Sequence, residues 1–227
     1  MNKKWAILYP LSCINLIKVL LKERPKAKLK VIGSGKVYDR GAKLGKWNIA
    51  QEEYEERFMP FLLDTDGKLL DSVEFLGLMG NEKFAIMKKA RIGVVNPTAL
   101  TEMCPGSALE FQACGVPVIS GAMGGLFDTV QHNNTGILVR NNKKLTRALI
   151  ELLENDNMNY QYGLNASKFV SGKFDYNKVC SKWISLFYNV YNDQNINSVR
   201  PRVKRNIFKD IKYIRLLIRK VFPFLIK

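Results

Sequence analysis

Five short apolar segments rich in valine and isoleucine recur along this chain, and stretches with helical spacing separate them. The apolar segments are 28–32, 73–76, 92–96, 117–120 and 136–139, and the helical patterns are 50–59, 82–90, 106–114, 143–154, 158–170 and 176–191. Uninterrupted apolar strands are typical of parallel sheets buried on both faces. The alternation therefore predicts an α/β fold with a doubly wound parallel sheet, which binds ligands at the carboxyl ends of its strands.

The run Thr101–Ile119 carries the strongest functional signal in the chain. Pro105 and Ser107 are residues that open helices, and Gly115 is one that closes them. The first backbone N–H groups of this helix would point out of its N-terminus, where a partial positive charge favours a phosphate or pyrophosphate. These groups belong to Gly106, Ser107 and Ala108.

Two carboxylates flank this predicted anion site. Glu102 lies in the loop before the helix, and Glu110 lies on its first turns. Carboxylate oxygens accept charge-assisted hydrogen bonds from vicinal hydroxyls, so the arrangement suits a nucleotide sugar. The alternative for each residue is an exposed charge, or for Glu102 an interaction with the adjacent helix end.

The spacing of these glutamates resembles the Glu-x7-Glu motif of retaining GT-B-type glycosyltransferases, group 1 and family-4-like. Further segments resemble that family in the same order, namely 27–35, 72–77, 92–97 and 121–139, so that the resemblance covers roughly residues 4–191. The family implies two Rossmann-like halves, of which the first binds the acceptor and the second the donor. This chain resembles the second half only, and a complete enzyme would need about twice its length.

The resemblance also implies roles for individual residues. Glu102 would contact the donor-sugar hydroxyls as the catalytic residue, and Glu110 would contact the ribose hydroxyls. Helix N–H groups and basic side chains would stabilise the departing diphosphate. The family supplies basic residues from the loop after its first strand, for which Lys3 and Lys4 are the nearest candidates. No metal ion and no cofactor besides the nucleotide-sugar co-substrate, of unknown base, are expected.

Gly33-Ser34-Gly35 follows the predicted strand 28–32. It does not complete a G-x-G-x-x-G dinucleotide fingerprint, because position 38 is tyrosine. Gly33 and Gly35 are interpreted as donor-binding positions that let the backbone approach the ligand, and an ordinary tight turn is an equal alternative.

Residues 5–21 have apolar side chains at helical spacing, which predicts a first helix leading into the strand at 28–32. The first strand of a GT-B donor half would then be missing. A secretory signal is the rival interpretation, because Lys3 and Lys4 precede the apolar run, although no small-x-small cleavage site follows.

Cysteine and histidine usage limits the chemistry. The four cysteines have no C-x-x-C spacing, which fits unpaired thiols in a reducing cytosol. Cys104 is interpreted as a packing residue. The single histidine, His132, excludes a multi-histidine metal site and is interpreted as a solvated loop residue.

The C-terminal segment 200–227 holds ten Lys or Arg and one Asp, a net +9 of the chain's +16. Its apolar residues form a helical stripe beside this basic face, which predicts an amphipathic helix on an anionic membrane. Packing on an acceptor half is the alternative. The predicted organisation is a nucleotide-sugar-binding domain at 1–175, a GT-B crossing helix at 176–191, a linker at 192–199 and this tail. Nucleic acid is not an expected partner, since no base-reading motif accompanies the charge.

Three functions are therefore compatible with the sequence. The first is the donor half of a hexosyltransferase-type enzyme of polysaccharide biosynthesis, acting on a glycan or lipid-linked acceptor with an acceptor-domain partner chain. It would be cytoplasmic and peripheral on the inner face of the membrane. The second is a noncatalytic nucleotide-sugar-binding or scaffold protein, and the third is a truncated inactive remnant.

Overall fold

The computed structural model describes residues 5–9, 27–37, 40–41, 43–97 and 102–192 of the 227-residue chain. Its contacts divide into two compact units, Met1–Asp175 and Tyr176–Lys227. The sheet and the candidate site belong to the first unit, whereas the described part of the second unit is one helix.

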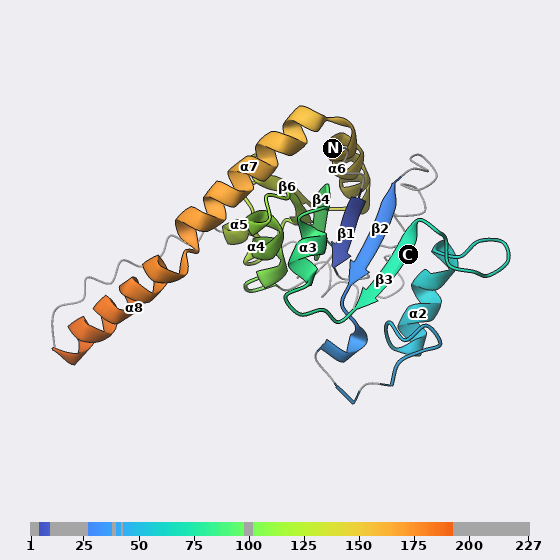
Figure 1. Ribbon diagram of the computed structural model, residues 1–227, viewed down its shortest axis with the longest axis horizontal. Helices are drawn as coiled ribbons and strands as arrows, with labels where there is room; N and C mark the ends of the chain where they lie inside the picture. The colour runs from blue at the N-terminus through green and yellow to red at the C-terminus, as the bar shows by residue number, and fades with distance from the viewer. Residues whose placement is uncertain (1–4, 10–26, 38–39, 42, 98–101, 193–227) are drawn as a thin grey trace, which may run out of the picture. The chain divides into compact units, whose positions relative to one another are not determined.

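Six parallel strands form one sheet in the order β3-β2-β1-β4-β5-β6 (Figure 1). The strands are β1 (Trp5–Tyr9), β2 (Lys28–Ile32), β3 (Val73–Gly77), β4 (Ile92–Val95), β5 (Val118–Gly121) and β6 (Gly136–Val139). The strand order runs outwards from β1 to β3 and then returns to β4 beside β1. This order confirms the predicted doubly wound fold, whose ligands bind where the order reverses, between β1 and β4.

The prediction of a helix from residue 5 is wrong, because Trp5–Tyr9 form β1. This strand pairs with both β2 and β4, so it is a central strand of the sheet, and the prediction that the first strand is missing is also wrong. A short apolar run fits a helix and a strand equally well by periodicity. Pro10 is the local signal against a continuous helix, since proline cannot donate a helical hydrogen bond. Residues 10–26 lie outside the described part of the chain.

Helices fill most of the connections between the strands. In the first unit they are α2 (Glu52–Phe58), α3 (Lys83–Met87), α4 (Gly106–Ala113), α5 (Leu126–Thr129), α6 (Asn142–Glu154) and α7 (Asp156–Lys173), with the 3-10 turns η2 (Gly35–Val37) and η3 (Met59–Phe61). The side chains of Asn141 and Asn155 accept hydrogen bonds from the first turns of α6 and α7 and so cap them. The one-turn helix α5 is absent from the sequence prediction, because four residues carry no helical period.

The sheet separates two hydrophobic clusters. On β4, Ile92 and Val94 belong to one cluster with side chains of α2 and α6. Val95 belongs to the other, which includes side chains of α3, α4 and α5. Figure 1 shows α3 and α4 beside β4. The alternation along one strand explains the uninterrupted apolar segments, since both faces of the sheet are covered.

Close packing on Gly93 holds α4 against β4. A Cβ atom at Gly93 would overlap the Phe111 ring, which is fully buried. The aromatic ring of α4 therefore lies directly on the backbone of β4. Because α4 follows β4 in the chain, this contact also fixes the N-terminus of α4 at the carboxyl edge of the sheet.

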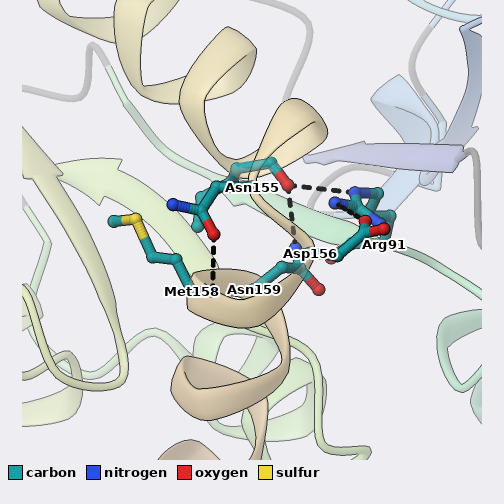
Figure 2. Close-up of polar contacts among 6 residues, drawn as sticks. Arg91, Asn155, Asp156, Met158 and Asn159 are labelled. Carbon is teal, nitrogen blue, oxygen red and sulfur yellow. Dashed lines mark hydrogen bonds and ion pairs between the residues drawn. The ribbon is translucent and has the colours of Figure 1, made fainter.

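A polar network at the amino end of β4 joins α6 to α7 (Figure 2). Arg91 Nε donates to the Leu152 carbonyl oxygen at 2.9 Å, and Arg91 Nη2 lies 2.6 Å from Asp156 Oδ1. Asn159 Nδ2 donates to the carbonyl oxygens of Arg91 and Leu152 at 3.0 and 3.2 Å. This network secures the two helices at the end of β4 opposite the candidate site.

The described helix of the second unit is α8 (Tyr176–Tyr191), and none of its residues is buried. Its exposed large apolar side chains are Tyr176, Val179, Trp183, Ile184, Leu186, Phe187, Tyr188, Val190 and Tyr191. Apart from Asn192, the predicted linker 192–199 and the predicted basic helix 200–227 lie outside the described residues. Within the part of the chain that is described, no helix has the length and apolar character to cross a bilayer.

Candidate functional site

Glu102 lies in the loop between β4 and α4, at the carboxyl edge of the sheet. Asn96 directly follows β4 with a φ of 42°, a left-handed conformation that asparagine adopts more readily than most residues. The Asn96 Nδ2 group donates a hydrogen bond to Glu102 Oε2. The carboxylate predicted to face the donor sugar is thus oriented by a neutral amide at the end of a central strand. Asn96 is absent from the site predicted from the sequence.

The turn after β5 holds the main chain of the same loop. The Gly125 N–H donates to the Glu102 carbonyl oxygen at 2.7 Å. A Cβ atom at Gly124 would overlap that oxygen, and one at Gly125 would overlap the Met103 carbonyl oxygen. Side chains are therefore excluded at both positions, which explains the adjacent glycines. Both glycines lie in the segment 121–139, which resembles the family, but they have no predicted role, although a glycine pair after a strand signals close backbone contact.

The N-terminus of α4 offers fewer free donors than predicted. Pro105 is the N-cap residue, and its carbonyl oxygen accepts the N–H groups of Ala108 at 3.0 Å and Leu109 at 3.4 Å. Ala108 is therefore satisfied within the helix. Gly106 and Ser107, the first two helical residues, carry N–H groups that helix geometry leaves without an intrahelical acceptor. Two backbone donors thus lie at the positive end of the helix dipole.

Glu110 forms an ion pair with Lys83, the first residue of α3. Glu110 Oε1 lies 2.7 Å from Lys83 Nζ, and the side chains are 31% and 23% exposed, respectively. The Lys83 ammonium also lies 5.3 Å from the centre of the Phe84 ring. Lys83 is absent from the site predicted from the sequence, because the partners are 27 positions apart and no local spacing rule connects them.

Gly33 and Gly35 follow β2 at the same edge of the sheet. Gly33 has a φ of 119°, and its N–H donates to the Gly77 carbonyl oxygen at 2.8 Å. The Gly35 N–H donates to the Ile49 carbonyl oxygen at 2.7 Å, and a Cβ atom at Gly35 would lie 3.0 Å from Leu44 Cδ2. Both N–H groups have protein acceptors, so these glycines shape the loop after β2. Their contact with a donor stays a prediction.

A buried carboxylate anchors the end of that loop. Glu55 of α2 is 3% exposed and accepts hydrogen bonds from the N–H groups of Trp47, Ile49 and Ala50 at 2.8, 2.7 and 2.9 Å. Three backbone donors satisfy a carboxylate that would otherwise be costly to bury. The other three glutamates of α2 are exposed. The sequence therefore carries no local signal that separates Glu55 from them.

Lys3 and Lys4, the predicted phosphate-binding residues, lie outside the described residues. Their assignment assumed that they follow the first strand, whereas β1 begins after them in the sequence. Asp64 and Asp66 have the spacing of a metal-binding Asp-x-Asp motif, which sequence analysis overlooked. Asp64 Oδ1 accepts the N–H groups of Asp66 and Lys68 and so closes a turn. Among the described residues, no group of three or more His, Cys, Asp or Glu could hold a metal ion.

The predictions for Cys104 and His132 differ in how well they agree with the structure. Cys104 is an exposed free thiol, so its interpretation as a packing residue is wrong. His132 is exposed as predicted, and its Nδ1 accepts the Leu138 N–H at 3.1 Å. Partial burial, together with the charges of Arg140 and Lys144, lowers the pKa of His132. This keeps the imidazole neutral at physiological pH.

The family model of glycosyl transferases group 1 matches residues 12–169, which include both glutamates and α4. An uncharacterized glycosyltransferase of Methanocaldococcus jannaschii is 25% identical over 126 residues, covering 55% of this chain and 32% of the relative. The chain spans about a third or less of the length of the curated relatives that it matches.

Solved structures share the fold of this chain. The HepE protein of Anabaena, determined in complex with UDP, superposes with a TM-score of 0.67 at 18% identity, covering 83% of this chain and 49% of HepE. The C-terminal domain of the group 1 family protein LpcC from Francisella tularensis gives a TM-score of 0.56 at 19% identity, covering 76% of this chain and 86% of that domain. At such identities the likeness concerns the fold.

Proposed function

This chain belongs to the family of glycosyl transferases group 1, and we propose that it forms the donor-binding half of a retaining glycosyltransferase. The nucleotide sugar would bind at the carboxyl edge of β4. A second Rossmann-like half, on a partner chain or another segment, would bind the glycan or lipid-linked acceptor. The fold shared with HepE, which was determined with UDP, supports a nucleoside diphosphate as the donor's leaving group.

One observation carries the proposal: a restrained carboxylate and a helix N-terminus lie within one short segment after a central strand. Asn96 orients the Glu102 carboxylate, and Gly125 fixes its main chain. Gly106 and Ser107 begin the helix four and five positions later. The helix end favours the diphosphate, and the carboxylate suits the hydroxyls of the attached sugar.

The proposed reaction follows from these two assignments, the helix end to the diphosphate and the Glu102 carboxylate to the sugar. The bond between the anomeric carbon and the diphosphate oxygen breaks, and the acceptor hydroxyl oxygen forms a bond to the same face of that carbon. The proton of the acceptor hydroxyl passes to the departing diphosphate. Negative charge develops on the diphosphate as its bond breaks, and preorganised N–H donors at the helix end stabilise that charge.

Isothermal titration of the full chain tests the donor site. The ligands are UDP, GDP and ADP, followed by the sugar conjugate of the nucleotide that binds. We expect saturable binding that Glu110→Ala weakens about 10- to 100-fold and that Glu53→Ala, an exposed glutamate of α2, leaves unchanged. Failure of all three nucleotides to bind a chain that unfolds cooperatively would contradict the proposal.

A noncatalytic nucleotide-sugar-binding protein is the second candidate, because the helix N-terminus and the carboxylates would bind a nucleotide sugar whether or not an acceptor reaches it. Incubation of the bound sugar conjugate with the chain separates the two functions. Slow release of free sugar, lost in Glu102→Ala, supports an enzyme. Binding without any sugar release favours the noncatalytic protein, and the absence of binding favours an inactive remnant.

We extend the proposal to the partners of the C-terminal region. The apolar side chains of α8 would pack on the acceptor half, and the basic segment 200–227 would bind an anionic membrane. Deleting 200–227 should abolish sedimentation with phosphatidylglycerol vesicles and leave nucleotide binding intact. Continued sedimentation of the deletion variant would contradict the membrane role.

A further inference from the structure

Lys83 changes what the neighbouring Glu110 carboxylate can recognise. Its Nζ lies 2.7 Å from Glu110 Oε1, so the two side chains present a positive donor and a negative acceptor next to each other. The sequence alone predicts Glu110 as an isolated carboxylate. An isolated carboxylate can only accept hydrogen bonds, and an ammonium can only donate them.

The positions of the two residues place the pair close to the candidate site. Lys83 opens α3, the helix that follows β3, and Glu110 lies on α4, the helix that follows β4. Helices that follow parallel strands begin at the carboxyl edge of the sheet, where ligands bind. The side chains of Lys83 and Glu110 keep 23% and 31% exposure, so a ligand can reach both while the surrounding protein restrains them.

The chemistry of the pair matches that of a vicinal diol. Each ribose hydroxyl can donate one hydrogen bond and accept others. One hydroxyl can therefore donate to Glu110 while the oxygen of its neighbour accepts from Lys83. A carboxylate alone would leave the hydroxyl oxygens without a protein donor, and an ammonium alone would leave the hydroxyl protons without an acceptor.

We propose that Lys83 is a ribose-binding residue that, together with Glu110, recognises the 2′,3′-diol of a nucleoside diphosphate. The inference rests on the proposed donor-binding function and deepens it. It assigns the discrimination between ribonucleotides and deoxyribonucleotides to an ion pair between two helices. Its consequence is that removing either partner lowers both the affinity for the ribonucleotide and the preference for it.

Titration of the full chain with UDP and 2′-deoxy-UDP tests the proposal, with GDP and 2′-deoxy-GDP used in the same way. Lys83→Met should weaken ribonucleotide binding about tenfold, the loss expected for one hydrogen bond to a charged group. It should also bring the dissociation constants of the ribo and deoxy ligands closer together. Lys83→Arg, which keeps a positive donor, should restore the preference.

Lys89→Met is the matched control, because it removes the same charge from an exposed position just beyond α3. It should leave both dissociation constants unchanged. If Lys83→Met weakens the ribo and deoxy ligands equally, or weakens neither, the ribose role is overturned while the donor site stands. If the folded wild-type chain binds no nucleotide of the ADP, UDP and GDP series, the proposed function fails, and this inference fails with it.

Discussion

The two glutamates of the candidate site are restrained by different means. Glu102 is held by neutral groups, the Asn96 amide on its carboxylate and the Gly125 N–H on its main chain. Glu110 is held by the charged side chain of Lys83, which comes from another helix. An asparagine amide, joined to the backbone by a single methylene group, has little freedom, whereas a lysine ammonium moves on a flexible four-carbon stem. The end of the site assigned to the sugar is thus more rigid than the end assigned to the nucleoside.

This difference fits the tasks proposed for the two ends. At the reacting carbon a displacement of about 1 Å costs a large factor in rate, so the groups around it gain from a fixed position. The nucleoside takes no part in bond breaking, so its recognition needs affinity and selectivity but no fixed position relative to the reacting carbon. Under the proposed function, a paired but movable carboxylate is therefore sufficient at Glu110, whereas Glu102 gains from restraint.

The largest effect should come from disturbing the main-chain contact that restrains the Glu102 loop. Gly125→Ala would force a Cβ atom into the Met103 carbonyl oxygen, so we expect the free energy of unfolding to fall by about 3 kcal/mol. Urea denaturation measures this. Gly172→Ala is the control, because its Cβ meets no atom within 4 Å and alanine favours a helix by ~0.5–1 kcal/mol. Equal stability of the two variants would refute the close contact.

The next largest effect should be on ligand binding, and it should differ between the two carboxylates. Glu110→Ala should weaken the nucleoside diphosphate and its sugar conjugate alike, whereas Glu102→Ala should spare the nucleoside diphosphate and weaken the sugar conjugate. Each loss should be about 10- to 100-fold, as for hydrogen bonds to a charged group. Titration calorimetry of both ligands with both variants gives the four values. An equal effect of Glu102→Ala on the two ligands would disprove the division.

A smaller effect should follow from removing the amide that orients Glu102. Asn96→Gly tolerates the left-handed backbone and deletes the hydrogen bond, so we expect the sugar conjugate to bind about fivefold more weakly. Asn96→Ala should show the same binding loss and in addition a stability lower by about 1 kcal/mol, because alanine is strained in that conformation. Unchanged sugar-conjugate binding in both variants would show that Glu102 needs no such orientation.

The smallest effect should be on the stability of the fold when the ion pair between Lys83 and Glu110 is removed. Lys83→Met removes a partly exposed ion pair, so the free energy of unfolding should change by less than about 1 kcal/mol. Thermal unfolding at low and high salt checks this. A loss well above this value would mean that the pair is a structural element of the fold, and that its binding role is secondary.

Local signals predicted the sheet well where each strand is a short run of valine and isoleucine. The segments 28–32 and 136–139 match β2 and β6 residue by residue. Four ends of β3, β4 and β5 shift by one residue, and two of these shifts have identifiable reasons. Asn96 turns into the left-handed region directly after β4, and Pro117, which has no N–H to donate, precedes β5.

The segment that begins at Trp5 shows where periodicity fails. Its apolar residues fit a helix as well as a strand, and the two neighbouring strands of the sheet select the strand. The pairing partners begin at Lys28 and Ile92, far along the sequence. No window centred on Trp5 contains that information.

The sequence by itself determined the alternation of strands and helices, the helix start after Pro105 and the candidate carboxylates Glu102 and Glu110, because each of these depends on neighbours within a few residues. Only the tertiary structure decided what surrounds the carboxylates. Lys83 reaches Glu110 and Gly125 reaches Glu102 through contacts between separate elements. Such contacts depend on the packing of α3 and α4 on the sheet and on the turn after β5, and packing is a property of the folded chain as a whole.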